Sequence, residues 1–169
     1  MLNFEKRGGM KQTQFDKHTI AWFKIAECVS RGEKERALGV YRLLSHSFND
    51  NAVARQLEAD IYLSFEEYDA AIALYRIAME MYQKSERYLE AVAVCEHLIT
   101  MLSSDMLLRR EALKLYNALN NMPKMKFHTE KILDQIAFVR QDHVLQEFLV
   151  AVEGISDELY VYAVEYAGK

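Results

Sequence analysis

The stretch Ala71-Ile-Ala-Leu-Tyr75-Arg-Ile-Ala78 decides the fold of this chain. Thirty-four residues earlier the sequence reads Ala37-Leu-Gly-Val-Tyr41-Arg-Leu-Leu44. Both stretches carry an alanine, a tyrosine four residues later, and a small or aliphatic residue three positions after the tyrosine. This spacing places all three positions on one face of a helix. A period of about 34 residues is typical of stacked helix-turn-helix repeats.

The composition favours a chain that is nearly all helical. Half of the 169 residues are apolar, and the chain contains one proline and six glycines. An all-β protein needs many more turn residues than this. The length suits one domain with a substantial core. We therefore predict an all-α fold of about nine helices joined by short turns.

Apolar periodicity and turn residues locate the helices. We expect them at about 18–31, 34–47, 52–65, 68–84, 86–102, 105–119, 123–139, 142–152 and 156–167. Gly32 supplies the left-handed conformation that closes the first helix, and Pro123 fits the first turn of the seventh, where its missing N–H is not needed. Residues 1–16 read as a polar N-terminal arm, and residues 17–169 as a single helical repeat domain.

The N-terminus has charge but no apolar core, so it does not read as a signal peptide. No run of 18 uncharged apolar residues occurs, so we expect no membrane span. Cys28 and Cys95 lie among apolar residues in expected helices, which favours buried reduced thiols over a disulfide. These features predict a cytoplasmic protein.

The chain resembles the tetratricopeptide repeat family, whose unit runs W-x2-L-G-x2-Y, then A-x3-F and a closing P. Two segments carry the resemblance: Trp22-x2-Ile25-Ala26-x2-Val29 with Ala37-x3-Tyr41, and Ala59-x2-Tyr62 with Ala71-x3-Tyr75-x2-Ala78. We read these positions as core. The likeness covers residues 20–78 and then becomes irregular, with Ala91 and Ala112 following at intervals of 20 and 21 residues, and Glu66 replaces the usual glycine. The resemblance implies a right-handed α-solenoid of antiparallel helix hairpins.

In this family the first helix of each pair lines a concave groove that binds a partner segment. Carried across by position, the resemblance implies these partner-binding residues: Phe23, Glu27, Arg31, Gln56, Asp60, Leu63 and Ser64. An exposed phenylalanine beside charged groups is a good anchor for a peptide or helix. Relatives that clamp the free carboxylate of a C-terminal tail need Lys and Asn where Phe23 and Glu27 stand. Acidic C-terminal tails are therefore disfavoured as ligands.

No motif indicates an enzyme. The five histidines are scattered singly, without HExxH or a Cys/His cluster of zinc spacing, and there is no phosphate loop or GxSxG elbow. We predict a non-enzymatic protein with no catalytic residue, cofactor or metal. An enzyme whose residues meet only in space remains an alternative.

A basic stretch over residues 109–131 raises nucleic-acid binding as another alternative. It contains Arg109, Arg110, Lys114, Lys124, Lys126 and Lys131, with Tyr116 and Phe127 nearby. The net charge of the chain is −4, however, and phosphate binding normally needs a dominant basic face.

The leading interpretation is an adaptor or chaperone-like module that binds a segment of another protein. A subunit or chaperone of a secretion system or other macromolecular assembly is the alternative within the same class. Tyr160, Tyr162 and Tyr166 in the last helix suggest either a capping face or a self-association surface.

Overall fold

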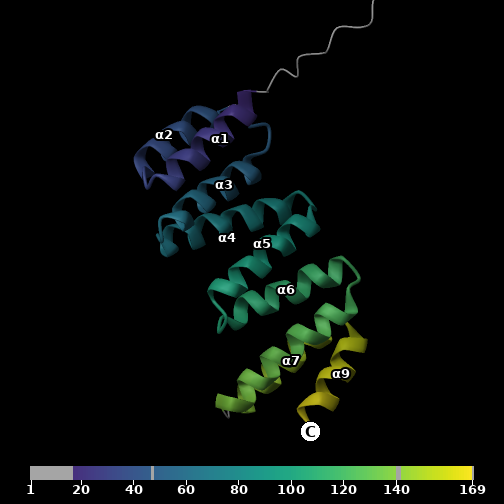
Figure 1. Ribbon diagram of the computed structural model, residues 1–169. Coiled ribbons are helices and arrows are strands. Elements are labelled where there is room, and N and C mark those ends of the chain that lie inside the picture. Colours follow the sequence, from purple (N-terminus) through teal and green to yellow (C-terminus); the bar gives the residue numbers. More distant parts are fainter. Residues whose placement is uncertain (1–16, 47, 140–141, 169) are drawn as a thin grey trace, which may run out of the picture. The chain divides into compact units, whose positions relative to one another are not determined.

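A computed structural model of the chain describes residues 17–46, 48–139 and 142–168 (Figure 1). The expected arm of residues 1–16 lies outside the described residues. The described ranges contain nine α-helices and no strand, each helix within two residues of its expected bounds, so the all-α prediction is confirmed. The chain divides into two compact units, Met1–Ser47 and Phe48–Lys169, whereas the sequence predicts no boundary at residue 47. Each unit is described by itself.

Unit 1 consists of α1 (Lys17–Ser30) packed against α2 (Lys34–Ser45). Its buried residues are Ile25, Ala37, Leu38, Tyr41 and Leu44. The expected core positions of α1 are only partly correct, because Trp22 and Ala26 are exposed and Val29 is half-buried. A helix that packs against one neighbour within its unit can bury only a narrow stripe, and here Ile25 occupies that stripe on α1.

The described residues of unit 2 form seven helices. They are α3 (Asn51–Ser64), α4 (Tyr68–Lys84), α5 (Tyr88–Met101), α6 (Met106–Ala118), α7 (Met122–Val139), α8 (Asp142–Glu153) and α9 (Asp157–Ala167). From α3 to α7 each helix packs against the next one in the chain, and α9 packs against both α7 and α8 (Figure 1). One hydrophobic cluster runs through the unit from Ala52 in α3 to Ala163 in α9.

Four helices end with a residue in the left-handed conformation. These residues are Gly32 (φ 73°), Glu66 (φ 60°), Glu86 (φ 58°) and Asn120 (φ 52°). The N–H of the following residue then donates to a carbonyl five residues earlier, for example Glu67 to Tyr62 at 3.0 Å, and the next helix begins at once. This hydrogen bond satisfies carbonyls that a helix end otherwise leaves free. Left-handed backbone costs a residue with a side chain about 1 kcal/mol.

Side-chain caps begin the helices that follow longer connections. Asp50 and Asp105 each accept two backbone N–H groups of the next turn, at distances between 2.9 and 3.2 Å. Such caps satisfy donors that have no partner inside the helix. Pro123 lies in the first turn of α7, as its missing N–H predicts.

Candidate protein-binding site

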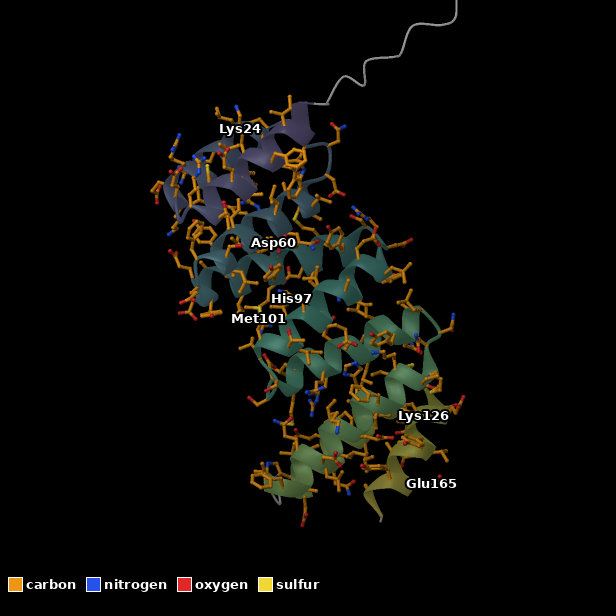
Figure 2. All side chains as sticks on the ribbon, viewed as in Figure 1. Lys24, Asp60, His97, Met101, Lys126 and Glu165 are labelled. Carbon is orange, nitrogen blue, oxygen red and sulfur yellow. The ribbon has the colours of Figure 1, made fainter. Side chains whose placement is uncertain are left out.

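An open cleft of about 700 Å³ lies where α1 and α2 meet in unit 1. Its walls are two matching stripes, because residues spaced i, i+3, i+4 and i+7 share one face of a helix. The α1 stripe is Lys24, Glu27, Cys28 and Arg31, and the α2 stripe is Arg36, Gly39, Val40 and Leu43, with Glu33 and Arg42 completing the lining. All lining residues belong to unit 1, and Lys24 is labelled on the α1 wall in Figure 2.

The α2 wall presents apolar surface to solvent. Leu43 is 82% exposed, and Val40, one turn earlier on the same stripe, is half-buried. Single exposed leucines are common on protein surfaces. Here the exposed leucine lines a concave surface, which is the arrangement that ligand and peptide sites use.

The rim of the cleft carries excess positive charge. Two ion pairs neutralise part of it: Glu27 with Arg31 at 2.6 Å, and Glu33 with Arg36 at 2.7 Å. Lys24 and Arg42 have no side-chain ion pair within the part of the chain that the structure describes. The lining therefore offers two uncompensated cations to an incoming group.

Gly39 opens the cleft from the middle of α2. Glycine inside a helix costs about 1 kcal/mol relative to alanine. A Cβ atom at Gly39 would meet no atom within 4 Å, and its φ is not positive. Neither packing nor backbone conformation therefore requires glycine here. Its effect is to leave the space between the two walls open.

Two of the three partner-binding residues predicted in α1 line this cleft. Glu27 and Arg31 form part of its α1 wall, and Phe23 lies one turn before Glu27 with 67% of its surface exposed. The argument against acidic ligands treats Glu27 as an unpaired negative charge. Its ion pair with Arg31 removes that premise.

The cleft residues that sequence reasoning missed are Lys24, Gly39, Arg42 and Leu43. A glycine in the middle of a strong helical pattern was the available signal. The cations and the leucine share no motif, because the two stripes meet only when the helices pack.

The residues predicted in α3 make contacts inside unit 2. Gln56 accepts a hydrogen bond from the Tyr82 hydroxyl at 3.0 Å, and Asp60 accepts one from the Tyr75 hydroxyl. Leu63 is half-buried against the core, and Ser64 donates to the carbonyl of Asp60 at 2.7 Å. Gln56 and Asp60 thus position tyrosines of α4, a role that the sequence analysis did not anticipate. Whether they also contact a partner stays a prediction.

The contact between Asp60 and tyrosine recurs along unit 2. On α3, α5 and α7 a fully buried small residue (Ala59, Cys95, Thr129) precedes an acid (Asp60, Glu96, Glu130) that accepts a tyrosine hydroxyl (Tyr75, Tyr116, Tyr162). The acids are 36 and 34 residues apart. This register continues past residue 78, where the Ala-x3-Tyr pattern becomes irregular. The repeated feature is a hydroxyl–carboxylate pair as well as an aromatic filler.

Glu96 is the most densely bonded of these acids. Its Oε1 accepts the Tyr116 hydroxyl at 2.6 Å and lies 3.2 Å from Nε2 of His128 and 3.5 Å from Nζ of Lys124. The imidazole of His128 is fully buried and stacks on Tyr116, with ring centroids 5.5 Å apart. The cluster joins α5, α6 and α7.

Burial lowers the pKa of His128 and outweighs the attraction of Glu96. The imidazole is therefore neutral near pH 7 and donates from Nε2 to Glu96, which leaves Nδ1 without a partner in the described part of the chain. For Glu96, burial opposes ionisation, but the hydrogen bond from Tyr116 and the nearby positive groups outweigh it and lower its pKa. Burial and the bond to Glu96 raise the pKa of Tyr116. The carboxylate is ionised and the hydroxyl neutral at pH 7.

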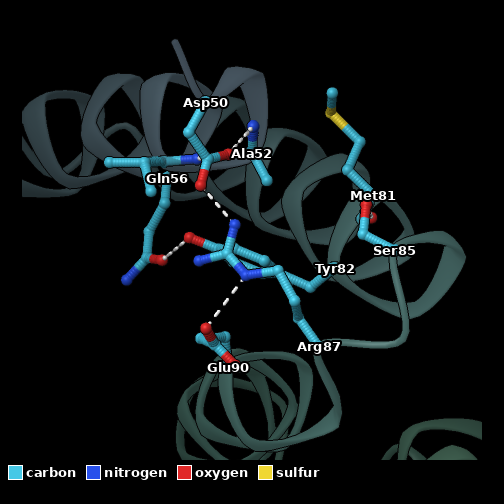
Figure 3. Close-up of polar contacts among 9 residues, drawn as sticks. Asp50, Ala52, Gln56, Met81, Tyr82, Ser85, Arg87 and Glu90 are labelled. Carbon is cyan, nitrogen blue, oxygen red and sulfur yellow. Dashed lines mark hydrogen bonds and ion pairs between the residues drawn. The ribbon is translucent and has the colours of Figure 1, made fainter. Parts of the chain in front are cut away.

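A second polar network joins three helix ends in unit 2 (Figure 3). Arg87, which precedes α5, donates to Asp50 at the start of α3 and to Glu90 in α5, the latter at 2.9 Å. Its guanidinium lies 4.6 Å from the ring centroid of Tyr82 at the end of α4. Burial opposes ionisation of Asp50, but the hydrogen bond from Arg87 outweighs it and lowers the pKa of Asp50. These contacts fix the α3, α4 and α5 termini and are structural.

The cations of the 109–131 stretch are engaged inside unit 2. Its lysines pair with acids: Lys114 with Glu111 at 3.1 Å, Lys124 with Glu96 at 3.5 Å, Lys126 with Glu158 at 3.4 Å, and Lys131 with Asp134 at 3.8 Å. Arg109 donates to the carbonyl of Ser103 at 2.9 Å. The guanidinium of Arg110 lies 5.5 Å from the ring centroid of Phe148. The positive charge that phosphate binding requires is thus largely compensated.

The aromatic residues of α9 face α7. Tyr162 donates to Glu130, and Tyr166 donates to Asp134 at 3.0 Å. The hydrogen bond to Glu130, with burial, raises the pKa of Tyr162 to about 12. These two hydroxyls are therefore used in packing the last helix onto unit 2.

Among the residues that the structure describes, no three His, Cys, Asp or Glu side chains gather as potential metal ligands. None of the helices in those ranges combines the length and apolarity needed to cross a bilayer. Comparison of the chain with known protein families and with curated proteins finds no match.

Proposed function

We propose that this protein is a non-enzymatic protein-binding module that docks a segment of another protein in the α1–α2 cleft. The observation that carries the proposal is the cleft itself: a concave, partly apolar surface held open by a helical glycine that the fold does not need. Exposed Phe23 and Leu43 supply apolar anchors beside it. Such a surface suits a helix or peptide laid along two helical walls.

The proposed architecture is a right-handed α-solenoid similar to tetratricopeptide repeats. Two recurrences support it. The left-handed turns recur at 34 residues, from Gly32 to Glu66 and from Glu86 to Asn120. The tyrosine–acid pairs on α3, α5 and α7 recur at 36 and 34 residues. A constant interval between equivalent contacts is what stacked helix pairs produce.

The chemistry of the buried groups supports a binding role over a catalytic one. Burial raises the pKa of the Cys95 thiol to about 12, which removes it as a nucleophile near neutral pH. His128 is buried between Tyr116 and Phe127, where no substrate can reach its ring. Both groups are therefore better explained as parts of the core.

Within this class we propose a cytoplasmic adaptor or chaperone-like protein, with an assembly or secretion subunit as the alternative. The two cysteines are free thiols, which agrees with a reducing compartment. The compensated lysines of α6 and α7 give nucleic-acid binding no support.

Affinity capture with cleft variants tests this function. Gly39→Leu fills the cleft and raises helix propensity, so the fold is retained while docking is lost. Lys84→Glu is the matched control, because Lys84 is exposed at the end of α4 in unit 2. We expect wild type and the control to capture a protein from extracts of the source cells, and to bind it after purification at least tenfold more tightly than Gly39→Leu. Equal binding by all three would reject the cleft as the docking site.

A further inference from the structure

We infer that the segment docked in the α1–α2 cleft is helix α9 of a second copy of this chain. The inference rests on the proposed function, because it names the partner of that same cleft. It starts from an uneven distribution of charge. Residues 17–46 contain six Lys or Arg and three acids, whereas residues 142–168 contain six acids and no Lys or Arg. Opposite charge on two surfaces of one chain favours contact between copies.

One face of α9 is exposed and combines valine with acids. Asp157, Val161, Val164 and Glu165 are exposed and lie at i, i+4, i+7 and i+8, which is one helical stripe. Val161 and Val164 are 55% and 42% exposed. Glu165, labelled in Figure 2, and Asp157 have no ion pair among the described residues, whereas Glu158 already pairs with Lys126.

This stripe matches the cleft in both shape and charge. Its two valines are spaced to meet Val40 and Leu43 on the cleft wall, as an amphipathic helix meets a groove. Its two free acids complement Lys24 and Arg42, the two cations of the lining that lack ion pairs. The hydroxyls of Tyr162 and Tyr166 bind α7, so α9 is already held as a helix and loses little freedom on docking.

The cleft and the α9 stripe are different surfaces of one chain. A contact between them is therefore heterologous, and copies add head to tail instead of closing as a twofold dimer. Because the contact relies on exposed charges, it weakens as salt increases.

Sedimentation velocity of the full chain tests the inference. We expect the weight-average sedimentation coefficient to rise with protein concentration at about 0.05 M salt and to return to the monomer value at about 0.5 M salt. Arg42→Glu disables the cleft and Glu165→Lys disables the stripe, and each should weaken self-association about tenfold. Lys84→Glu, which makes a similar charge change outside both surfaces, should associate like wild type.

Mixing the two disabled variants gives the sharpest result. Arg42→Glu retains an intact stripe and Glu165→Lys retains an intact cleft, so the mixture should form a 1:1 dimer that cannot grow further. Alkylation of Cys28, which lines the cleft, should slow in that mixture relative to either variant alone. A mixture that stays monomeric would overturn the inference.

Other outcomes also decide the matter. Wild type that is monomeric at every concentration and salt would overturn the inference. Cys28 protection that is independent of concentration would indicate docking within one copy and would also overturn it. If Gly39→Leu still loses a captured protein in those cases, the proposed function stands and only the identity of the partner fails. If Gly39→Leu loses nothing, the proposed function fails as well.

Discussion

The hydroxyl of Tyr116 on α6 donates a 2.6 Å hydrogen bond to the carboxylate of Glu96 on α5. The same relationship joins Tyr75 to Asp60 and Tyr162 to Glu130. Each pair ties the helix that carries the tyrosine to the helix that carries the acid. Hydrogen bonds to charged groups stabilise a protein more than neutral ones, so these pairs set how the helices of unit 2 meet.

Removing the Tyr116 hydroxyl should destabilise unit 2 measurably. Tyr116→Phe keeps the ring packing but leaves Glu96 with only His128 and Lys124, and we expect a loss of about 1.5 to 3 kcal/mol in the free energy of unfolding at pH 7. Urea denaturation monitored by circular dichroism measures the loss. Tyr160→Phe is the control, because Tyr160 is only half-buried in α9, and its effect should be small. Equal losses for the two variants would contradict a special role for the Tyr116–Glu96 pair.

Stability should fall as pH decreases below about 6.5. Burial lowers the pKa of His128 in the folded state, so the unfolded state binds a proton first and protonation favours unfolding. One such group changes the free energy of unfolding by at most about 1.4 kcal/mol per pH unit. Glu96, whose pKa is also lowered, adds its own loss only near and below its ordinary value of 4.5.

Urea titrations at pH 7.5 and 5.5 isolate the histidine contribution. His128→Leu should reduce the loss of stability between the two values, whereas His143→Gln, at an exposed position of α8, should leave it unchanged. A His128→Leu protein with the full wild-type pH dependence would show that another group is responsible.

Glu66→Gly should stabilise the protein. Glu66 has φ of 60°, a conformation that costs about 1 kcal/mol for a residue with a side chain. The extra freedom of glycine in the unfolded chain offsets part of this gain, so we expect a net increase of about 0.5 kcal/mol. Glu80→Gly, in the interior of α4, should instead destabilise by about 1 kcal/mol. A lower melting temperature for Glu66→Gly would contradict the backbone argument.

The two cysteines should differ sharply in reactivity. Cys95 is buried, its thiol lies 3.5 Å from the carbonyl of Leu108, and burial raises its pKa to about 12. Cys28 is half-buried at the wall of the cleft. With iodoacetamide at pH 8, peptide mass spectrometry should find Cys28 modified in the folded protein and Cys95 modified only in urea. Equal rates without urea would show that the core around Cys95 opens readily.

Much of the fold was predictable because its signals are local. Apolar periodicity located every helix within two residues, and Gly32, Asp50 and Pro123 marked helix ends through their own backbone and side-chain chemistry. The left-handed turn at Glu86 was not predictable, because glutamate does not favour that conformation. Trp22 was expected in the core, but α1 buries only the stripe that faces α2, and Trp22 lies outside it.

The candidate site was predictable only in part. The resemblance pointed to Glu27 and Arg31, which line the cleft, but it could not find Lys24, Arg42 or Leu43. Those residues come together only through the packing of α1 on α2. The tyrosine hydroxyls were missed for a related reason: a tyrosine in an apolar stripe reads as a core filler, and its acid lies between 15 and 32 residues away.

Site-specific photo-crosslinking tests the central claim most directly. A photoreactive amino acid placed at Leu43 points from the cleft wall, and one placed at Leu107 on α6 is the control, because that leucine is also 71% exposed but lies in unit 2. Irradiation in the source cells should join the Leu43 variant to another polypeptide, either a second copy or a different protein, and should leave the Leu107 variant uncrosslinked. Equal crosslinking from both positions, or none from Leu43, would contradict the cleft as the docking site.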